Sequence, residues 1–302
     1  MGVTSANHVE RSAEVESSRQ QAVWAAIADI SQIATLPEIT LKVIRLVNDP
    51  ESTASALSDV ITHDPALGAR ILKIVNSGYY GLPGEIRSIS QAIRLLGLNA
   101  LKIIAIAASL GKLFRGGQIY PSFNARDLWT HCIAVAAGSK ILARRIGLPG
   151  TDEAFLGGLI HDIGILVELQ VRRPELISAI EALDADEAVS FREAEFNVLG
   201  ATHEQFGSAL CRAWRFPVCF ADVAEYHHRP LEAPQEGAVL PMIVHVADVV
   251  AARLQIGYGR TVDATDVNPA VLERLSLTDQ TLGEVMAEIP EAAEEAATLL
   301  WS

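Results

Sequence analysis

Histidine and aspartate side chains recur along the apolar stretches between residues 127 and 248, where their spacing could support metal chemistry. The stretch GLIHDIGILVE, residues 158–168, sets His161 beside Asp162 in an otherwise apolar run, which predicts that both residues lie within one buried helix. A buried carboxylate costs several kcal/mol unless a cation or a metal compensates it, and the nearest arginines lie in more polar stretches. We therefore predict that Asp162 meets one or two divalent metal ions.

Further imidazole and carboxylate groups lie on the apolar faces of separate predicted helices. His131 follows Asp127 by four residues, and Asp248 follows His245 by three, so each pair shares a helix face. Neutral imidazole with carboxylate suits Mn, Fe, Zn or Ni, and a carboxylate can bridge two ions. The predicted metal ligands are His131, His161, Asp162, His203, His227, His228 and Asp248.

Each of these residues also has an interpretation without chemistry. A single buried histidine such as His131 or His203 more often satisfies a core hydrogen bond, and Asp127 could simply cap a helix. His245 is equally suited to packing or to supporting a ligand. Neighbouring residues on a helix point about 100° apart, so His227 and His228 could form a solvated helix end. The combination on several helices favours a metal site.

The composition limits the classes of protein that the chain can belong to. With 302 residues, 50% hydrophobic and 20% charged, it can form one large domain or two small ones. A net charge of −13 argues against general nucleic-acid binding. Its three cysteines form no CxxC pair, which is typical of reduced thiols. We find no signal peptide and no apolar run that would span a membrane, so we expect a cytoplasmic protein.

The spacing of apolar residues predicts an all-α protein. From residue 22 onward these residues recur every three or four positions, and no convincing alternation appears. Asp64 before Pro65 predicts a helix start, Ser52 and Ser88 are further candidate caps, and Gly97 predicts a helix end. From about residue 266 the acidic sequence predicts short helices on the outside.

A change of composition near residues 115–125 divides the chain. We predict four segments: a mobile polar tail (1–20), an N-terminal helical subdomain (21–118), a second helical subdomain that carries the metal ligands (119–260) and an acidic helical extension (261–302). Because residues 34–113 carry almost no ionisable group on an apolar face, we expect them to fold without metal and to pack on the helices of His131 and His161.

The order of these motifs resembles known families. The order His131, His161–Asp162 and Asp248 resembles the HD superfamily of metal-dependent phosphohydrolases, and His203 with His227–His228 resembles its HD-GYP branch of cyclic dinucleotide phosphodiesterases. The upstream motifs LPEITLKVIRLVNDP, ITHDPALGARILKIVNSGYYG and IRSISQAIRLLGLNALKIIAIAASL are similar to the signature of HDOD, the HD-related output domain of bacterial signalling. The likeness runs from about residue 34 to about residue 248.

The HDOD resemblance implies an all-helical signalling protein whose surface binds a signalling protein partner, since many HDOD domains have lost their metal ligands. The HD resemblance implies an alternative, a phosphohydrolase in which Asp162 bridges two ions that activate water against a phosphate ester, with a phosphate-containing small ligand. HD-GYP proteins carry a lysine where this chain has Ile165, and Arg229 or Lys140 are the basic groups that could replace it. A third alternative is a scaffold without metal.

Overall fold

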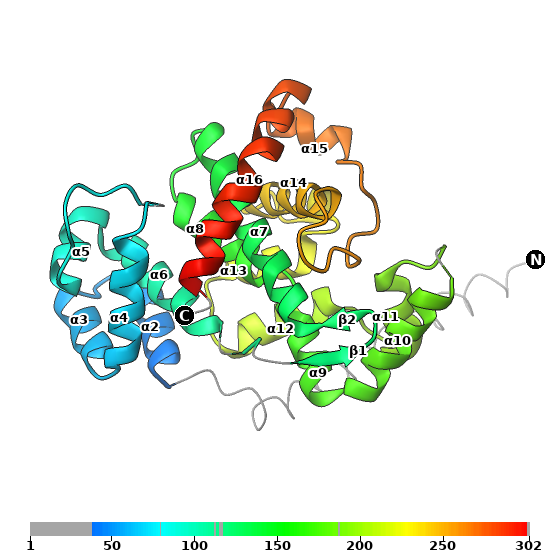
Figure 1. Cartoon of the computed structure of the whole chain (residues 1–302), viewed down its shortest axis with the longest axis horizontal. Helices are drawn as coiled ribbons and strands as arrows, with labels where there is room; N and C mark the ends of the chain where they lie inside the picture. The colour runs from blue at the N-terminus through cyan, green and yellow to red at the C-terminus, as the bar shows by residue number, and fades with distance from the viewer. Residues whose placement is uncertain (1–37, 79, 112, 115–116, 187, 301–302) are drawn as a thin grey trace, which may run out of the picture.

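The computed structural model describes residues 38–78, 80–111, 113–114, 117–186 and 188–300. The regular structure of these residues is almost entirely helical, which confirms the predicted all-α class (Figure 1). The β-structure in the described residues is one short antiparallel pair, β1 (Gln118–Tyr120) and β2 (Phe123–Asn124). The predicted polar tail lies outside the described residues.

The first group of helices lies at one end of the molecule, on the left in Figure 1. It consists of α2 (Glu38–Asn48), α3 (Ala54–Thr62), α4 (Pro65–Val75), α5 (Ile89–Leu96) and α6 (Leu98–Leu110). Asp64 caps α4 and Ser88 caps α5, as predicted, and α5 ends at Gly97. The cap predicted for α3 was wrong, because Thr53 takes that position and the Ser52 hydroxyl accepts a hydrogen bond from Lys102.

The second group surrounds α7 (Ala125–Arg145), which packs against α8, α14 and α16. Its other members are α8 (Thr151–Ile160), α9 (Ile163–Val171), α10 (Arg173–Ala185), α11 (Phe191–Leu199), α12 (His203–Ala213), α13 (Val218–Tyr226), the 3-10 turn η1 (Pro230–Glu232) and α14 (Val239–Arg253). Helix α6 packs on α8, and Phe114 stacks on Trp129 of α7 with ring centroids 4.4 Å apart. The two groups therefore meet where we expected.

The C-terminal sequence forms α15 (Pro269–Arg274) and α16 (Asp279–Leu300). The prediction of short helices was wrong, because α16 runs for 22 residues and continues through Pro290. It lies along α7 and reaches α4, so it crosses both groups (Figure 1). Its buried side chains recur every three or four residues, from Leu282 to Leu300, which explains why one long helix is favoured.

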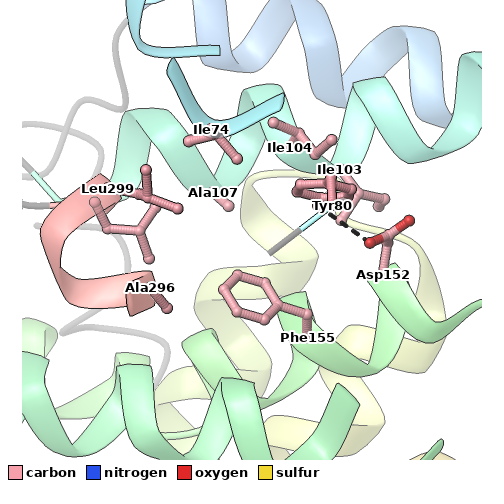
Figure 2. A pocket seen from close by; sticks show the side chains of 10 residues that line it. Ile74, Tyr80, Ile103, Ile104, Ala107, Asp152, Phe155, Ala296 and Leu299 are labelled. Atoms are coloured by element: carbon pink, nitrogen blue, oxygen red, sulfur yellow. Dashed lines mark hydrogen bonds between the residues drawn. The ribbon is translucent and has the colours of Figure 1, made fainter. Parts of the chain in front are cut away.

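An apolar pocket marks the junction of the two groups, and it is lined by residues of α4, α6, α8 and α16 (Figure 2). At its edge the Tyr80 hydroxyl donates a hydrogen bond to Asp152 Oδ1 over 3.2 Å. Asp152 also pairs with Lys140 of α7 at 2.8 Å, and the Lys140 Nζ lies 4.2 Å from the centroid of the Tyr80 ring. These contacts tie the first group to the start of α8.

The most apolar segment, Thr151–Val171, is long enough to cross a membrane, but 83% of its most apolar window is buried inside the protein. It is also not one helix. The prediction that His161 and Asp162 lie within a continuous helix was wrong, because α8 ends at Ile160 and α9 begins at Ile163. The pair occupies the turn between these two helices, where its side chains leave the helix axis and enter the core.

Candidate metal centre

The predicted ligands converge on one buried site within the second group of helices. They come from α7 (His131), the α8–α9 turn (His161, Asp162), the start of α12 (His203), the end of α13 (His227, His228) and α14 (Asp248). Potential ligand atoms lie within 4.8 Å of one another in three overlapping sets: Asp162, His203, His227 and His228; His131, His161 and Asp162; and His161, His227 and Asp248. Their side chains are 0% exposed, except His228 at 4%.

The histidine rings are held by their Nδ1 atoms. His161 Nδ1 donates to the Gly158 carbonyl over 2.7 Å, and His227 Nδ1 donates to the carbonyls of Val223 and Ala224 over 3.1 and 3.0 Å. A carbonyl oxygen only accepts, so the proton of each neutral ring lies on Nδ1 and Nε2 carries a lone pair. This is the tautomer in which Nε2 can bind a metal.

The lone pairs face other acceptors, which is unfavourable unless a cation lies between them. Nε2 of His161, His203 and His227 lies 3.3, 3.3 and 3.4 Å from an Asp162 oxygen. Neither oxygen of Asp162 has a hydrogen-bond partner among the described residues. Two ligand atoms each about 2.1 Å from one ion, at tetrahedral or right angles, are about 3.0–3.4 Å apart. The observed separations therefore fit a bound metal ion.

Asp248 forms the other end of the site. Its Oδ1 lies 2.9 Å from His131 Nε2 and 3.7 Å from His161 Nε2. Its Oδ2 has no hydrogen-bond partner in the described part of the chain and lies 3.8 Å from His228 Nδ1. Since His161 belongs to both ends, with Asp162 on one side and Asp248 on the other, the donor set can hold one ion or a pair.

Burial and mutual attraction set the charge of the cluster. Burial alone raises the pKa of Asp162 and Asp248, but the neighbouring histidines outweigh it and hold both pKa values well below the ordinary value. Burial lowers the pKa of His161, and Asp162 outweighs that effect and raises it. The ion-pair partners of both aspartates in the described residues are histidines. Protons on those histidines or metal ions must therefore balance two buried negative charges.

Several residues considered from the sequence lie elsewhere. Asp127 is exposed and does not join the ligands. Lys140 pairs with Asp152 away from the site, and Ile165 is 0% exposed in the core. His245 Nδ1 donates to the His227 carbonyl over 2.8 Å, so His245 supports the turn that carries two ligands. Of the nominated bases, Arg229 alone lies near, within 3.4 Å of Glu204.

Three buried carboxyl groups that the sequence did not indicate lie beside the ligands. Glu195 of α11 and Glu168 of α9 are 0% exposed, and Glu195 contacts His203. Glu204 is also fully buried and pairs with Arg192 at 2.6 Å. Both Glu195 and Glu204 belong to helices that look ordinarily amphipathic, so no spacing rule separates them from surface glutamates. Glu168 lies at the end of the apolar HD stretch, which was the one available signal.

Two glycines allow the ligand-bearing backbones to approach. A Cβ added at Gly164 of α9 would overlap the backbone of His203, so α9 and α12 cross at a distance that only glycine permits. Gly257 has φ of +70°, and a Cβ there would overlap the backbone of Asp127 and His131. The close crossings explain how side chains as short as aspartate reach a common centre.

Comparison with known families agrees with this architecture. The HDOD domain family matches residues 33–230, which is more than half of the chain. The chain belongs to the HDOD family. An uncharacterized protein of Treponema pallidum (strain Nichols) is 25% identical over 241 residues, which are 79% of this chain and 45% of that protein. The chain thus spans less than half the length of this curated relative.

Solved HDOD-like structures share the fold. An HDOD domain protein of unknown function from Geobacter sulfurreducens has a TM-score of 0.76 and 27% identity, covering 93% of this chain and 98% of that one. A candidate signal transduction protein from Marinobacter aquaeolei VT8 has a TM-score of 0.74 and 22% identity, covering 94% and 65%. A candidate metal-dependent phosphohydrolase from Shewanella amazonensis SB2B has a TM-score of 0.61 and 19% identity, covering 93% and 99%.

Proposed function

We propose that this HDOD protein is a cytoplasmic bacterial signalling module that binds a regulatory protein partner and holds one or two divalent transition-metal ions in a structural centre. The ligands are His131, His161, Asp162, His203, His227, His228 and Asp248. The observation that carries the proposal is the enclosure of this set, since the ligand side chains are 0–4% exposed. Closed sites are typical of structural metals, whereas catalytic sites keep an open position.

The basic side chains beside the site favour the same conclusion. Arg192 is committed to Glu204 and Asp263, at 2.6 and 3.0 Å. Arg229 is committed to Glu204 and Glu232, at 3.4 and 2.7 Å. A polyanionic substrate would have to displace these carboxylates before either guanidinium could bind its phosphate. Losing one charged contact to phosphate costs a few kcal/mol, or roughly two orders of magnitude in rate.

The alternative is a metal-dependent phosphohydrolase. It is favoured by the donor set, which suffices for two ions with Asp162 between the imidazoles. In that function the ions would supply Lewis acidity for attack by water on a phosphate ester, and Asp162 would be the one catalytic carboxylate. The solved relatives include both a candidate signal transduction protein and a candidate metal-dependent phosphohydrolase, so the choice between the two functions rests on the residues of the site.

The decisive experiment combines metal analysis with an activity assay. Untagged protein purified without chelator is analysed for Mn, Fe, Zn and Ni, and the loaded protein is incubated with cyclic dinucleotides beside an Asp162→Ala control. We expect bound metal in the wild type, none in the control and no useful turnover in either. A turnover of about 1 per second in the wild type, absent from the control, would instead support the phosphohydrolase function. Protein that binds none of the supplied ions would refute the metal centre.

The partner is tested separately, because the output function does not depend on hydrolysis. Affinity capture from the native cell lysate, followed by titration of each purified candidate, should give a saturable complex with one signalling protein. Absence of any saturable complex would refute the regulatory role.

A further inference from the structure

His203 differs from His161 and His227 in how its ring is held. His161 and His227 end their helices, so each donates Nδ1–H to a carbonyl three or four residues earlier in its own helix. His203 is the first residue of α12 and has no earlier turn of that helix to supply a carbonyl. Its Nδ1 acceptor must therefore come from another element.

Glu195 of α11 supplies that acceptor. Its Oε2 and Oε1 lie 2.8 and 3.0 Å from His203 Nδ1, and Oε2 also accepts the backbone N–H of His203 over 3.2 Å. The carboxylate thus holds both the ring and the first N–H of α12. Two contacts to one residue leave the His203 ring a single orientation.

That orientation sends Nε2 into the metal centre. Nε2 of His203 lies 3.3 Å from Asp162 Oδ1 and 3.1 Å from His228 Nε2. A carboxylate that accepts Nδ1–H fixes the tautomer with a lone pair on Nε2 and raises the basicity of the ligand. Without Glu195 the ring could turn about its Cβ–Cγ bond or carry its proton on Nε2, and either change removes one ligand.

We propose that Glu195 is a positioning residue of the metal centre, which fixes His203 with Nε2 toward Asp162 and thereby sets the affinity for divalent metal. The inference rests on the proposed function, because it takes His203 to be a ligand. Glu168 of α9 places a second fully buried carboxyl group near Glu195. Phe191 closes the remaining side, with its ring centroid 5.8 Å from that of His203.

The test measures metal affinity in Glu195→Gln, Glu195→Ala and a matched control, Glu193→Gln. Glu193 belongs to the same helix but is exposed, so its change removes one carboxylate from α11 without touching His203. Apo-protein is titrated with Zn²⁺ and with Mn²⁺ in competition with a chromogenic chelator, and folding is followed by circular dichroism. The visible spectrum of the Co²⁺-loaded protein reports the ligand geometry.

We expect Glu193→Gln to bind like the wild type, and both Glu195 variants to bind about 10- to 100-fold more weakly with an altered Co²⁺ spectrum. Glu195→Gln is isosteric and decides the question if Glu195→Ala fails to fold. Wild-type affinity and spectrum in a folded Glu195 variant would overturn the inference while leaving the metal centre intact. A wild-type protein that binds no ion would overturn the proposed metal centre, and the inference with it.

Discussion

Substitution of Gly164 by alanine tests whether the close crossing of α9 and α12 builds the metal centre. The added Cβ would overlap the His203 carbonyl oxygen and lie 2.7 Å from both the His203 carbonyl carbon and the Gly207 backbone nitrogen. Ordinary contact distances are about 3.5 Å, so the start of α12 must move by more than about 1 Å. His203 would move with it, because it begins that helix.

The magnitude follows from two opposing effects. Overpacking a core typically lowers the free energy of unfolding by about 1–3 kcal/mol. Replacing glycine by alanine in a helix raises it by about 0.5–1 kcal/mol. The contacts at Gly164 are backbone atoms, which cannot yield by a rotamer change, so we expect the upper part of the range and a net loss of about 1–2 kcal/mol. A ligand displaced by about 1 Å should also weaken metal binding by at least tenfold.

The matched control is Gly283→Ala. Gly283 is exposed on α16 and an added Cβ would meet nothing within 4 Å, so this variant should be more stable than the wild type by about 0.5–1 kcal/mol. Urea unfolding of the apo-proteins measures the stability, and chelator competition measures the metal affinity. If Gly164→Ala matches Gly283→Ala in both measurements, the close crossing does not position His203.

Three further changes test other parts of the structure. Chelation should lower the melting temperature modestly and leave the helical circular dichroism at 25 °C intact, because the first group of helices contains no ligand; global unfolding would contradict this. Glu168→Gln should raise the unfolding free energy of apo-protein at neutral pH, since burial, with Glu195 adding to it, raises the pKa of Glu168 well above its ordinary value. The stability that the protonated Glu168 carboxyl group contributes is complete below its unfolded pKa and is lost as pH rises through its folded pKa. In urea unfolding between pH 5 and pH 9, the free energy of unfolding of the Gln variant should therefore fall less with pH than that of the wild type. An equal fall in both proteins would show that Glu168 ionises freely. Asp152→Asn should cost about 1–3 kcal/mol by leaving Lys140, 5% exposed, without its carboxylate, and Lys140→Met should cost less; equal losses in urea unfolding would argue against the buried pair.

The all-helical class could be predicted from the sequence, because it depends on local patterns. Apolar spacing marked the helices, and Asp64 and Ser88 marked two of their starts. The structure then brought the predicted histidines and aspartates to one place. That result required the tertiary fold, since His131 and Asp248 are 117 residues apart in the chain.

Other features depend on contacts that no local pattern records. Asp127 lies four residues before His131, but it belongs to the first turn of α7, where its side chain is exposed while His131 is buried. Lys140 was a candidate for binding phosphate, but it forms an ion pair with Asp152 of α8 instead. Glu195 became a partner of His203 only because α11 packs near the start of α12. The acidic C-terminal sequence predicted short helices, but α16 packs along α7 and continues through Pro290 as one long helix.

The distribution of ligands over the helices defines what a metal would do in this molecule. Each element that carries a proposed ligand belongs to the second group, so a bound ion would join α7, the α8–α9 turn, α12, α13 and α14 without linking the first group. Metal that binds only the folded state stabilises it by about 2.7 kcal/mol when its free concentration is 100 times Kd. That stabilisation falls on the second group, whereas Tyr80 and its hydrogen bond to Asp152 connect the first group to α8 at the end opposite His161. The metal would therefore fix the second group of helices, on which the first group packs. This is a structural use of the metal, whereas the same ligands in an open site would serve hydrolysis.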